Sequence, residues 1–185
     1  MNFDYETDRL YIKVLNSDSA PEVLDFLSRN RAIFEPYECE KSPLYYTTHF
    51  QAETLHSEFT AYLEKRYARF YVYLKYAPHT IIGTVSFSNI RYFPYFDTTI
   101  GYKFDNDFHG NGYATEAVDM CISIIFNEFR LHRIEALVMP NNNASLQLVE
   151  RLGFDHEGTS THLVKMRGGW QTHERYALIN PVPDL

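Results

Sequence analysis

The chain has 185 residues, of which 45% are hydrophobic and 16% aromatic, so it is long enough to bury the core of one ordinary domain. Its net charge of −7 argues against a general nucleic-acid binder, which normally presents a basic face. No apolar run is long enough to span a bilayer, and the polar residues 1–8 are unlike a signal peptide. We therefore expect one domain over residues 1–185, cytoplasmic, with neither a membrane nor a nucleic acid as partner.

The first third of the chain predicts one short strand and two helices. Residues 9–15 alternate as in a strand, and a helix then begins at Asp18 or Ser19 and runs to about Arg29. Residues 33–46 contain two prolines and show no periodicity, which is typical of a loop.

A longer amphipathic helix is predicted next, because apolar residues recur at helical spacing from Thr48 to Arg69. Residues 70–75 and 81–90 alternate as the two strands of a hairpin, joined through a turn-like insert at residues 76–79. Residues 91–97 then form a connection that contains a proline and leads to the central strand.

The centre of the chain is a strand (residues 98–104), a polar turn (residues 105–109) and a Gly-x-Gly segment (residues 110–112) that opens a helix. In that order these elements direct several backbone N–H groups, and the positive end of the helix dipole, at one point. That point can hold a phosphate. Gly-x-Gly is also common in turns that bind nothing, so the neighbouring residues decide between the two interpretations.

The remaining elements are a short buried strand (residues 133–139), a helix (residues 143–152) that Gly153 ends, and two strands (residues 154–163 and 170–178) joined by a glycine pair. The predicted order is β, α, α, β, β, β, α, β, α, β, β. The two cysteines are too few for a disulfide framework, and no histidines have metal-ligand spacing, so we expect no metal.

Two stretches carry a resemblance to a known family. His109-x-x-Gly112-x-Ala114 is similar to the pattern Gln/Arg-x-x-Gly-x-Gly/Ala of the acyl-CoA pyrophosphate loop in the GNAT N-acetyltransferases. Downstream, residues 142–145 and 152–154 resemble the second signature of that family, and together the two stretches resemble its RimJ/RimL branch. His109 is the one departure in the loop, and it matters little because such a loop binds phosphate mainly through backbone N–H groups.

The resemblance extends to both ends of the chain, because residues 6–10 and residues 170–178 are similar to the opening and closing strands of that branch. It implies the GNAT fold of the α+β class, with a mixed, mostly antiparallel sheet of about six to seven strands and helices on both faces. It also implies one acetyltransferase domain over residues 1–185.

The family binds acetyl-CoA as a co-substrate, and its pantetheine pairs with the backbone of the central strand. In this chain the resemblance implies a cofactor-binding set from the central strand, the loop and the second signature: Tyr102, Phe104, His109, Gly110, Asn111, Gly112, Tyr113, Ala114, Thr115 and Asn142.

Two residues of the second signature are candidate catalytic residues. Relatives of the RimL kind use a serine at the position of Ser145 to protonate the leaving thiolate, whereas many other GNAT enzymes use a tyrosine, and Tyr113 is one of 15 in this chain. Asn142 is either a catalytic residue or a helix cap, and a cap contributes about 0.5–2 kcal/mol.

The general base is open, because the glutamate that RimL-like proteins carry after Gly-Phe is absent here, which leaves His162, Glu157, Glu35 or ordered water. The expected acceptor is the N-terminal α-amine of a protein, such as a ribosomal protein, attacking directly in a ternary complex. A small-molecule amine and a CoA-binding module without turnover are the alternatives. The oligomeric state is expected to be a monomer or a homodimer.

Overall fold

The computed structural model describes residues 2–166 and 168–182 of the chain. Its centre is one sheet of eight strands in the order β1-β2-β3-β4-β5-β6-β8-β7. All neighbours are antiparallel except β5 and β6. The strands are β1 (Asp4–Glu6), β2 (Leu10–Lys13), β3 (Ala68–Leu74), β4 (Ala77–Arg91), β5 (Asp97–Phe104), β6 (Arg133–Val138), β7 (Asp155–Met166) and β8 (Gly169–Ile179). The predicted α+β class and mixed sheet are confirmed.

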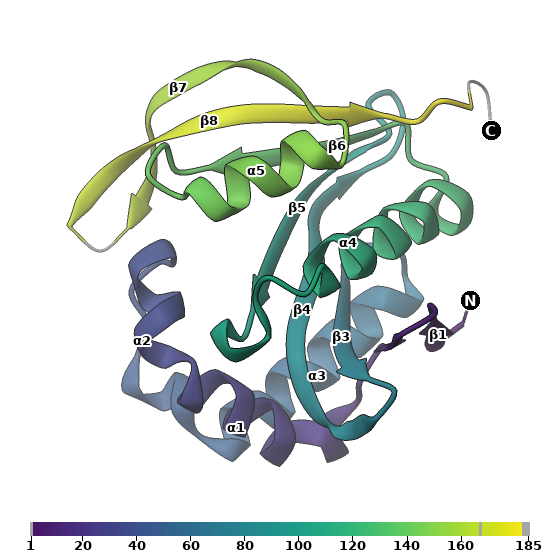
Figure 1. The fold of residues 1–185 in the computed structure, drawn as a ribbon, viewed down its shortest axis with the longest axis vertical. Helices are drawn as coiled ribbons and strands as arrows, with labels where there is room; N and C mark the ends of the chain where they lie inside the picture. Colours follow the sequence, from purple (N-terminus) through teal and green to yellow (C-terminus); the bar gives the residue numbers. More distant parts are fainter. Residues whose placement is uncertain (1, 167, 183–185) are drawn as a thin grey trace.

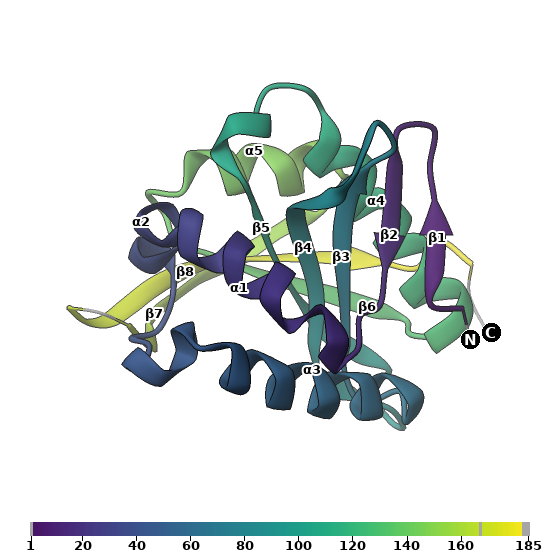
Figure 2. The same cartoon turned by 90° about the horizontal axis from the view of Figure 1, so that it is seen from below.

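Helices cover both faces of the sheet. Figure 1 shows α4 and α5 on its near face, and Figure 2 shows α3 on the opposite side, with α1 running across it. The α-helices are α1 (Ala20–Arg29), α2 (Arg31–Phe34), α3 (Thr48–Leu63), α4 (Tyr113–Ile124) and α5 (Asn143–Arg151). The short helical turns are η1 (Ser17–Ser19), η2 (Glu35–Tyr37), η3 (Pro43–Tyr46), η4 (Asn106–Phe108) and the π-turn η5 (Ile125–Phe129).

Two cores form because alternate residues of the central strands point to opposite faces. In β3, Phe70 and Val72 join the core under α4, whereas Tyr71 and Tyr73 join a smaller core with residues of α1 and α3. The smaller core reaches only β2 to β4 of the sheet. On that side, β5, β6 and β8 therefore present a face that α1 and α3 do not cover.

The structure corrects several of the predicted elements. The opening strand is two strands, because residues 7–9 form the turn between β1 and β2. The helix predicted to reach Arg69 ends at Leu63, since Lys65 has a left-handed backbone with φ of 54° and Ala68 already pairs with Phe87 of the sheet. Tyr67 therefore lies in the connection between α3 and β3, and Ala68 and Arg69 belong to the strand.

The predicted insert at residues 76–79 is also wrong, because β4 begins at Ala77, which pairs with Leu74 of β3. The turn between β3 and β4 is therefore shorter than the predicted insert, and Pro78 lies within β4. Part of the predicted loop at residues 33–46 is helical, as α2, η2 and η3. The later predicted elements agree with the structure to within a few residues. The differences are that β7 continues to Met166 and that α4 continues as the π-helix η5.

One feature of the sheet creates a site. The parallel pairing of β5 with β6 ends at Ile100 and Ala136, although both strands continue. Residues 101–104 of β5 consequently have no strand partner on that side in the described chain. The glycine loop follows β5 and α5 follows β6, so both helix N-termini lie at the end where the two strands diverge (Figure 1).

Candidate active site

The glycine loop after β5 presents free backbone donors. Gly110 and Gly112 have φ of 79° and 77°, a conformation that favours glycine, and Gly112 is the N-cap of α4. No described residue accepts a hydrogen bond from the N–H groups of residues 110–115. Unpaired N–H groups at a helix start attract anions, so the predicted phosphate-binding geometry is present.

Arg9, in the turn after β1, holds this loop from one side. Its Nε lies 2.7 Å from Glu116 Oε2, its Nη1 donates to the Asn111 carbonyl at 3.0 Å, and its guanidinium lies 4.6 Å from the centre of the Tyr113 ring. Thr7 also donates to Glu116, at 2.5 Å. Burial raises the pKa of Glu116, but the hydrogen bonds from Thr7 and Arg9 outweigh burial and lower it. Glu116 thus has a structural role, because it ties the turn after β1 to the first turn of α4.

Asp105 holds the loop from the other side, where β5 ends. Its carboxylate accepts from Arg29 Nε at 2.9 Å, from Asn30 Nδ2 at 3.1 Å and from the Asp107 N–H at 3.1 Å. Burial raises the pKa of Asp105, yet these hydrogen bonds, of which that from Asn30 lowers the pKa most, bring it below its ordinary value. The Asp105 carboxylate therefore fixes the end of α1 against the start of the loop.

The side chains of His109 and Asn111 turn back onto the loop itself. His109 Nε2 lies 3.2 Å from the Phe104 carbonyl, and because a carbonyl only accepts, Nε2 is the donor. Asn111 Nδ2 donates to the carbonyls of Phe108 and His109 at 3.2 and 3.1 Å. His109 and Asn111 both belong to the predicted cofactor-binding set. Their side chains fix the loop conformation and leave its N–H groups exposed.

Phe104, predicted to contribute only its backbone, also has a packing role. Its ring lies against Gly83 so closely that a Cβ on that glycine would lie 2.2 Å from the ring. Only glycine at position 83 leaves room for the ring. This contact fixes the end of β5 beside the loop.

A hollow of about 170 Å³ lies where β5 and β6 diverge. It is lined by the facing parts of the two strands and by residues of α5, η2 and β8: Tyr37, Ile100, Gly101, Tyr102, Ala136, Leu137, Val138, Met139, Asn142, Ser145 and His173. The predicted Tyr102, Asn142 and Ser145 are thus brought together. Tyr37 joins them from residues 33–46, the loop for which the family resemblance implies a place on the acceptor side, and His173 joins them from β8, for which only a strand was expected.

Asn142 and Ser145 have separable contacts. Asn142 is the N-cap of α5, and its Oδ1 accepts from the Ser145 N–H at 3.2 Å. The Ser145 side chain is not part of this cap. Its Oγ lies 2.7 Å from the Tyr102 hydroxyl. The Asn142 side chain therefore caps α5, whereas the Ser145 hydroxyl is available for another role.

The Tyr102 side chain adds a polar group that the sequence analysis treated as irrelevant. Burial raises the pKa of Tyr102 to about 12, although the hydrogen bond with Ser145 lowers it in part. The phenol is therefore protonated at neutral pH. It can donate to Ser145 Oγ but cannot act there as a base.

The three named candidates for the base lie elsewhere. Glu157 is hydrogen-bonded to Arg133 at 2.8 Å, Glu35 accepts from Arg31 at 2.7 Å, and His162 is an exposed residue of β7. None of them lines the hollow. Tyr113, the loop tyrosine considered as an alternative acid, does not line it either.

A second hollow of about 350 Å³ lies toward the other end of the β5–β6 pair and is lined by Asn89, Arg91, Asp97, Thr98, Thr99 and Glu135. It is larger, but its charged groups already pair with one another or with neighbours, as Arg91 with Asp97 and Glu135 with Arg133. We assign the chemistry to the smaller hollow because it adjoins the free end of β5 and contains Ser145.

Two negative observations concern the described residues. They contain no group of three or more His, Cys, Asp or Glu side chains that could hold a metal ion. None of their helices has the length and apolar character that crossing a membrane requires.

Comparison with known sequences gives a consistent result. Residues 9–155 match the family described as "Acetyltransferase (GNAT) domain". The chain is 35% identical to the probable N-acetyltransferase YjcK of Bacillus subtilis strain 168, over 93% of this chain and 94% of that protein. It is 30% identical to the ribosomal protein uS5-alanine N-acetyltransferase of Escherichia coli strain K12, over 95% and 90% of the two chains.

Solved structures agree. The chain superposes on the ribosomal-protein-S5-alanine acetyltransferase from Vibrio fischeri with a TM-score of 0.94 and 29% identity, over 100% of both chains. It shares its fold with Mycobacterium smegmatis RimJ, solved in complex with CoA-disulfide, at a TM-score of 0.86 and 21% identity, over 95% of this chain and 84% of RimJ.

Proposed function

We propose an acceptor for this chain, which belongs to the GNAT acetyltransferase family and is an N-acetyltransferase. The acceptor is the α-amino group at the N-terminus of a protein, and a ribosomal protein is the preferred class. Residues 1–185 act as a single acetyltransferase domain in the cytoplasm. The acetyl group passes from acetyl-CoA by direct attack of the amine in a ternary complex. The observation that carries the proposal is the hollow between β5 and β6, where Ser145 lies beside the free end of β5, the strand that leads into the glycine loop.

The residues of the loop fit a diphosphate. The N–H groups from Gly110 to Thr115 have no acceptor among the described residues, and cationic side chains lie beside them. Arg9 contacts the loop directly, and Arg151 donates to Thr115 Oγ1 at 3.3 Å. Backbone donors, a helix N-terminus and cations together favour a dianionic group. We therefore assign residues 109–115 to the diphosphate of acetyl-CoA.

The unpaired edge of β5 fits an extended ligand arm. Residues 101–104 have backbone groups without a strand partner on the side of β6. The pantetheine amides of acetyl-CoA would pair there with Tyr102 and Phe104, and Asn142 closes the far side. Bound acetyl-CoA supplies the acetyl group as a thioester.

Ser145 is the proposed general acid. Its hydroxyl is polarised by the Tyr102 phenol at 2.7 Å, which restores a hydrogen bond to Oγ when the serine gives up its own proton. A protonated leaving group departs more readily than a thiolate. Asn142 supports this arrangement by capping the helix that carries Ser145.

The α-amine is favoured over the lysine side chain because of its acidity. Reference pKa values of about 7.7–8.0 for an α-amine and about 10.4 for lysine make the neutral fraction at pH 7 several hundred-fold larger for the α-amine. Among the described residues, none of the side chains that line the hollow is a carboxylate that could deprotonate a lysine. The net charge of −7 also favours a basic partner, such as the N-terminus of a ribosomal protein.

A competition experiment tests the acceptor. A basic peptide with a free N-terminus is mixed with the same peptide acetylated there but carrying free lysines, and labelling from acetyl-CoA is followed by mass spectrometry between pH 6 and 9. We expect labelling of the free N-terminus only. Equal or faster labelling of lysines would contradict the proposed acceptor. Turnover of a small amine with neither peptide labelled would support a small-molecule acetyltransferase instead, and binding of acetyl-CoA without any turnover would indicate a binding module.

A further inference from the structure

We propose that His173 is the general base that takes a proton from the acceptor amine. The inference rests on the proposed function and names a residue for a step that the sequence left open.

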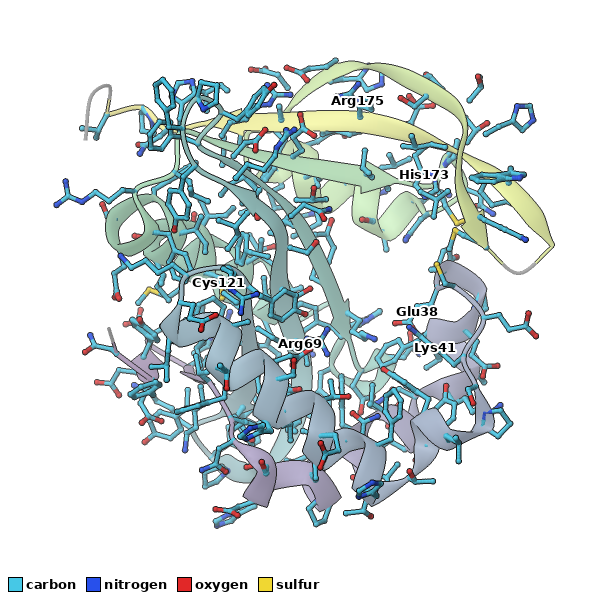
Figure 3. The ribbon with its side chains drawn as sticks, turned by 180° about the vertical axis from the view of Figure 1, so that it is seen from behind. Glu38, Lys41, Arg69, Cys121, His173 and Arg175 are labelled. Atoms are coloured by element: carbon cyan, nitrogen blue, oxygen red, sulfur yellow. The ribbon has the colours of Figure 1, made fainter. Side chains whose placement is uncertain are left out.

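His173 lies inside the hollow that contains Ser145. It is on β8, on the sheet face that α1 and α3 leave uncovered, and only 5% of the residue is exposed. Figure 3 labels His173 on β8, with Glu38 on the segment across from it. That segment closes over this region, because Cys39 Sγ lies 3.5 Å from the Lys165 carbonyl of β7 and Tyr37 lines the same hollow. An acceptor entering between them would meet His173.

The hydrogen bond of the ring defines which nitrogen is basic. His173 Nδ1 lies 3.2 Å from the Gln171 carbonyl, and a carbonyl oxygen only accepts, so Nδ1 carries the proton. In a neutral imidazole the other nitrogen then has a free lone pair. No described residue donates to Nε2. The structure thus holds one nitrogen in place and leaves the second as a proton acceptor.

In the part of the chain that the structure describes, no other side chain that lines the hollow is a base. Its other titratable side chains are the phenols of Tyr37 and Tyr102, and a neutral phenol donates. The charged neighbours of His173 along β8 are engaged elsewhere. Glu174 accepts from Thr159 at 2.7 Å on the opposite face, and Arg175 lies 3.5 Å from Glu135.

Two charged side chains on the facing segment are paired with each other or with the sheet. Glu38 pairs with Lys103 of β5, and Lys41 lies 3.8 Å from Glu38. From α5, the groups that line the hollow are the uncharged Asn142 and Ser145. His173 is therefore the basic group in the hollow for which the described residues provide no ionic partner.

Each proton that moves during acetyl transfer has a donor and an acceptor. The acceptor ammonium gives one proton to His173 Nε2, and the neutral amine then attacks the thioester carbon. The C–N bond forms and the C–S bond breaks, the sulfur takes a proton from Ser145, and the second proton of the nitrogen returns to Ser145. One proton leaves to solvent from His173. The products are the N-acetyl amine and CoA with a free thiol.

The test is the pH dependence of His173→Gln, measured with an alanine-initiated basic peptide as acceptor. Without the base, turnover should follow the neutral fraction of the peptide's own amine. That fraction rises about thirtyfold between pH 6.5 and pH 9 for a pKa near 8. We therefore expect kcat/KM of the variant to be about thirtyfold below that of the parent at pH 6.5 and within about threefold at pH 9. Affinity for acetyl-CoA, measured by calorimetry, should not change.

Two further variants keep the test decisive. His173→Asn retains an amide that can donate to the Gln171 carbonyl, so it should fold if the larger Gln does not, with the same pH behaviour. His56→Gln makes a change of the same kind at an exposed position of α3 and should leave the profile unchanged.

A uniform rise in KM with the pH profile unchanged would overturn the assignment, because it would mean that His173 only contacts the acceptor. The proposed function would survive that result. If the parent enzyme transfers acetyl groups to no amine at all, the proposed function fails and the base assignment fails with it.

Discussion

The two sides of the hollow between β5 and β6 are constructed differently. The donor side consists of one continuous stretch, residues 102–115, and offers mainly backbone groups: the free edge of β5 and the N–H groups of the glycine loop. The acceptor side consists of single side chains from distant segments, Tyr37 of η2 and His173 of β8. A site made of main-chain groups leaves a local motif in the sequence. A site made of side chains exists only once the fold brings them together.

The supports of the two sides differ as well. The donor loop is held at both ends by charged groups, Arg9 with Glu116 and Arg29 with Asp105. On the acceptor side the segment after η2 is joined to the sheet mainly by the pair of Glu38 and Lys103. Burial lowers the pKa of Lys103 more than Glu38 raises it, so this pair lies in a largely dehydrated place. Because the two sides are built and supported separately, we expect a single substitution to change either the affinity for acetyl-CoA or the rate of acetyl transfer, but not both equally.

The largest effect is expected from Gly112→Asp, which places a carboxylate where the diphosphate approaches the backbone. Like charges about 4 Å apart cost about 4 kcal/mol near a protein surface, which corresponds to about 10³-fold in affinity. Calorimetry with acetyl-CoA measures the loss.

Gly153→Asp is the matched control for that change. Gly153 has φ of 80°, and a Cβ added there would meet open space, so the variant receives the same charge and a similar backbone strain outside the site. It should bind acetyl-CoA like the parent. If Gly112→Asp also bound normally while folded, the loop would not be the diphosphate site.

The next largest effect is expected from Ser145→Ala. The change removes the proposed acid but keeps the cap, because Asn142 accepts from the backbone N–H of residue 145. We expect kcat to fall on the order of 10²-fold, the lower end for a general acid, with unchanged affinity for acetyl-CoA. Steady-state kinetics and calorimetry check this prediction. An unchanged kcat would assign protonation of the thiolate to another group.

The same contrast explains what could be predicted from the sequence. The β5, loop and α4 unit follows from local signals, namely an alternating strand, Gly110 and Gly112 at left-handed positions, and a helical apolar face. The three-residue strand β1 has too few residues for a periodic signal. The end of α3 was misplaced because Tyr67 continues the helical spacing while the sheet already claims Ala68.

The site was predictable to the same extent. Ser145 and Asn142 follow β6 within one short signature, so the sequence places them together. The role of His173 could not be inferred, because its position in the hollow depends on β8 pairing with β6 and on the segment at Tyr37 folding across it. The available signal is Trp170-x-x-His173 in the predicted closing strand, and this pattern is equally typical of packing. The Tyr102 phenol was missed because only its backbone was expected to matter.

A smaller effect is expected from Tyr102→Phe, which removes the hydroxyl that lies 2.7 Å from Ser145 Oγ. One hydrogen bond contributes about 0.5–1.5 kcal/mol, so kcat should fall by about twofold to tenfold, with KM for acetyl-CoA little changed because the backbone of residue 102 remains. Combining the change with Ser145→Ala should add nothing further. Additive losses in the double variant would show that Tyr102 acts independently of the serine.

The smallest effect is expected from Asn142→Ala, and it concerns stability more than chemistry. Asn142 Oδ1 accepts from the Ser145 N–H at the start of α5, and losing such a cap costs about 1 kcal/mol. For a chain of this length the midpoint of thermal unfolding should fall by about 2–4 °C. Asn142→Asp retains a capping oxygen and should restore the midpoint, which separates the cap from any role of the amide in the hollow. If Asn142→Asp were as stable as the parent but had lost kcat, the amide itself would contact the reacting groups, and Asn142 would belong to the chemistry as well as to the helix.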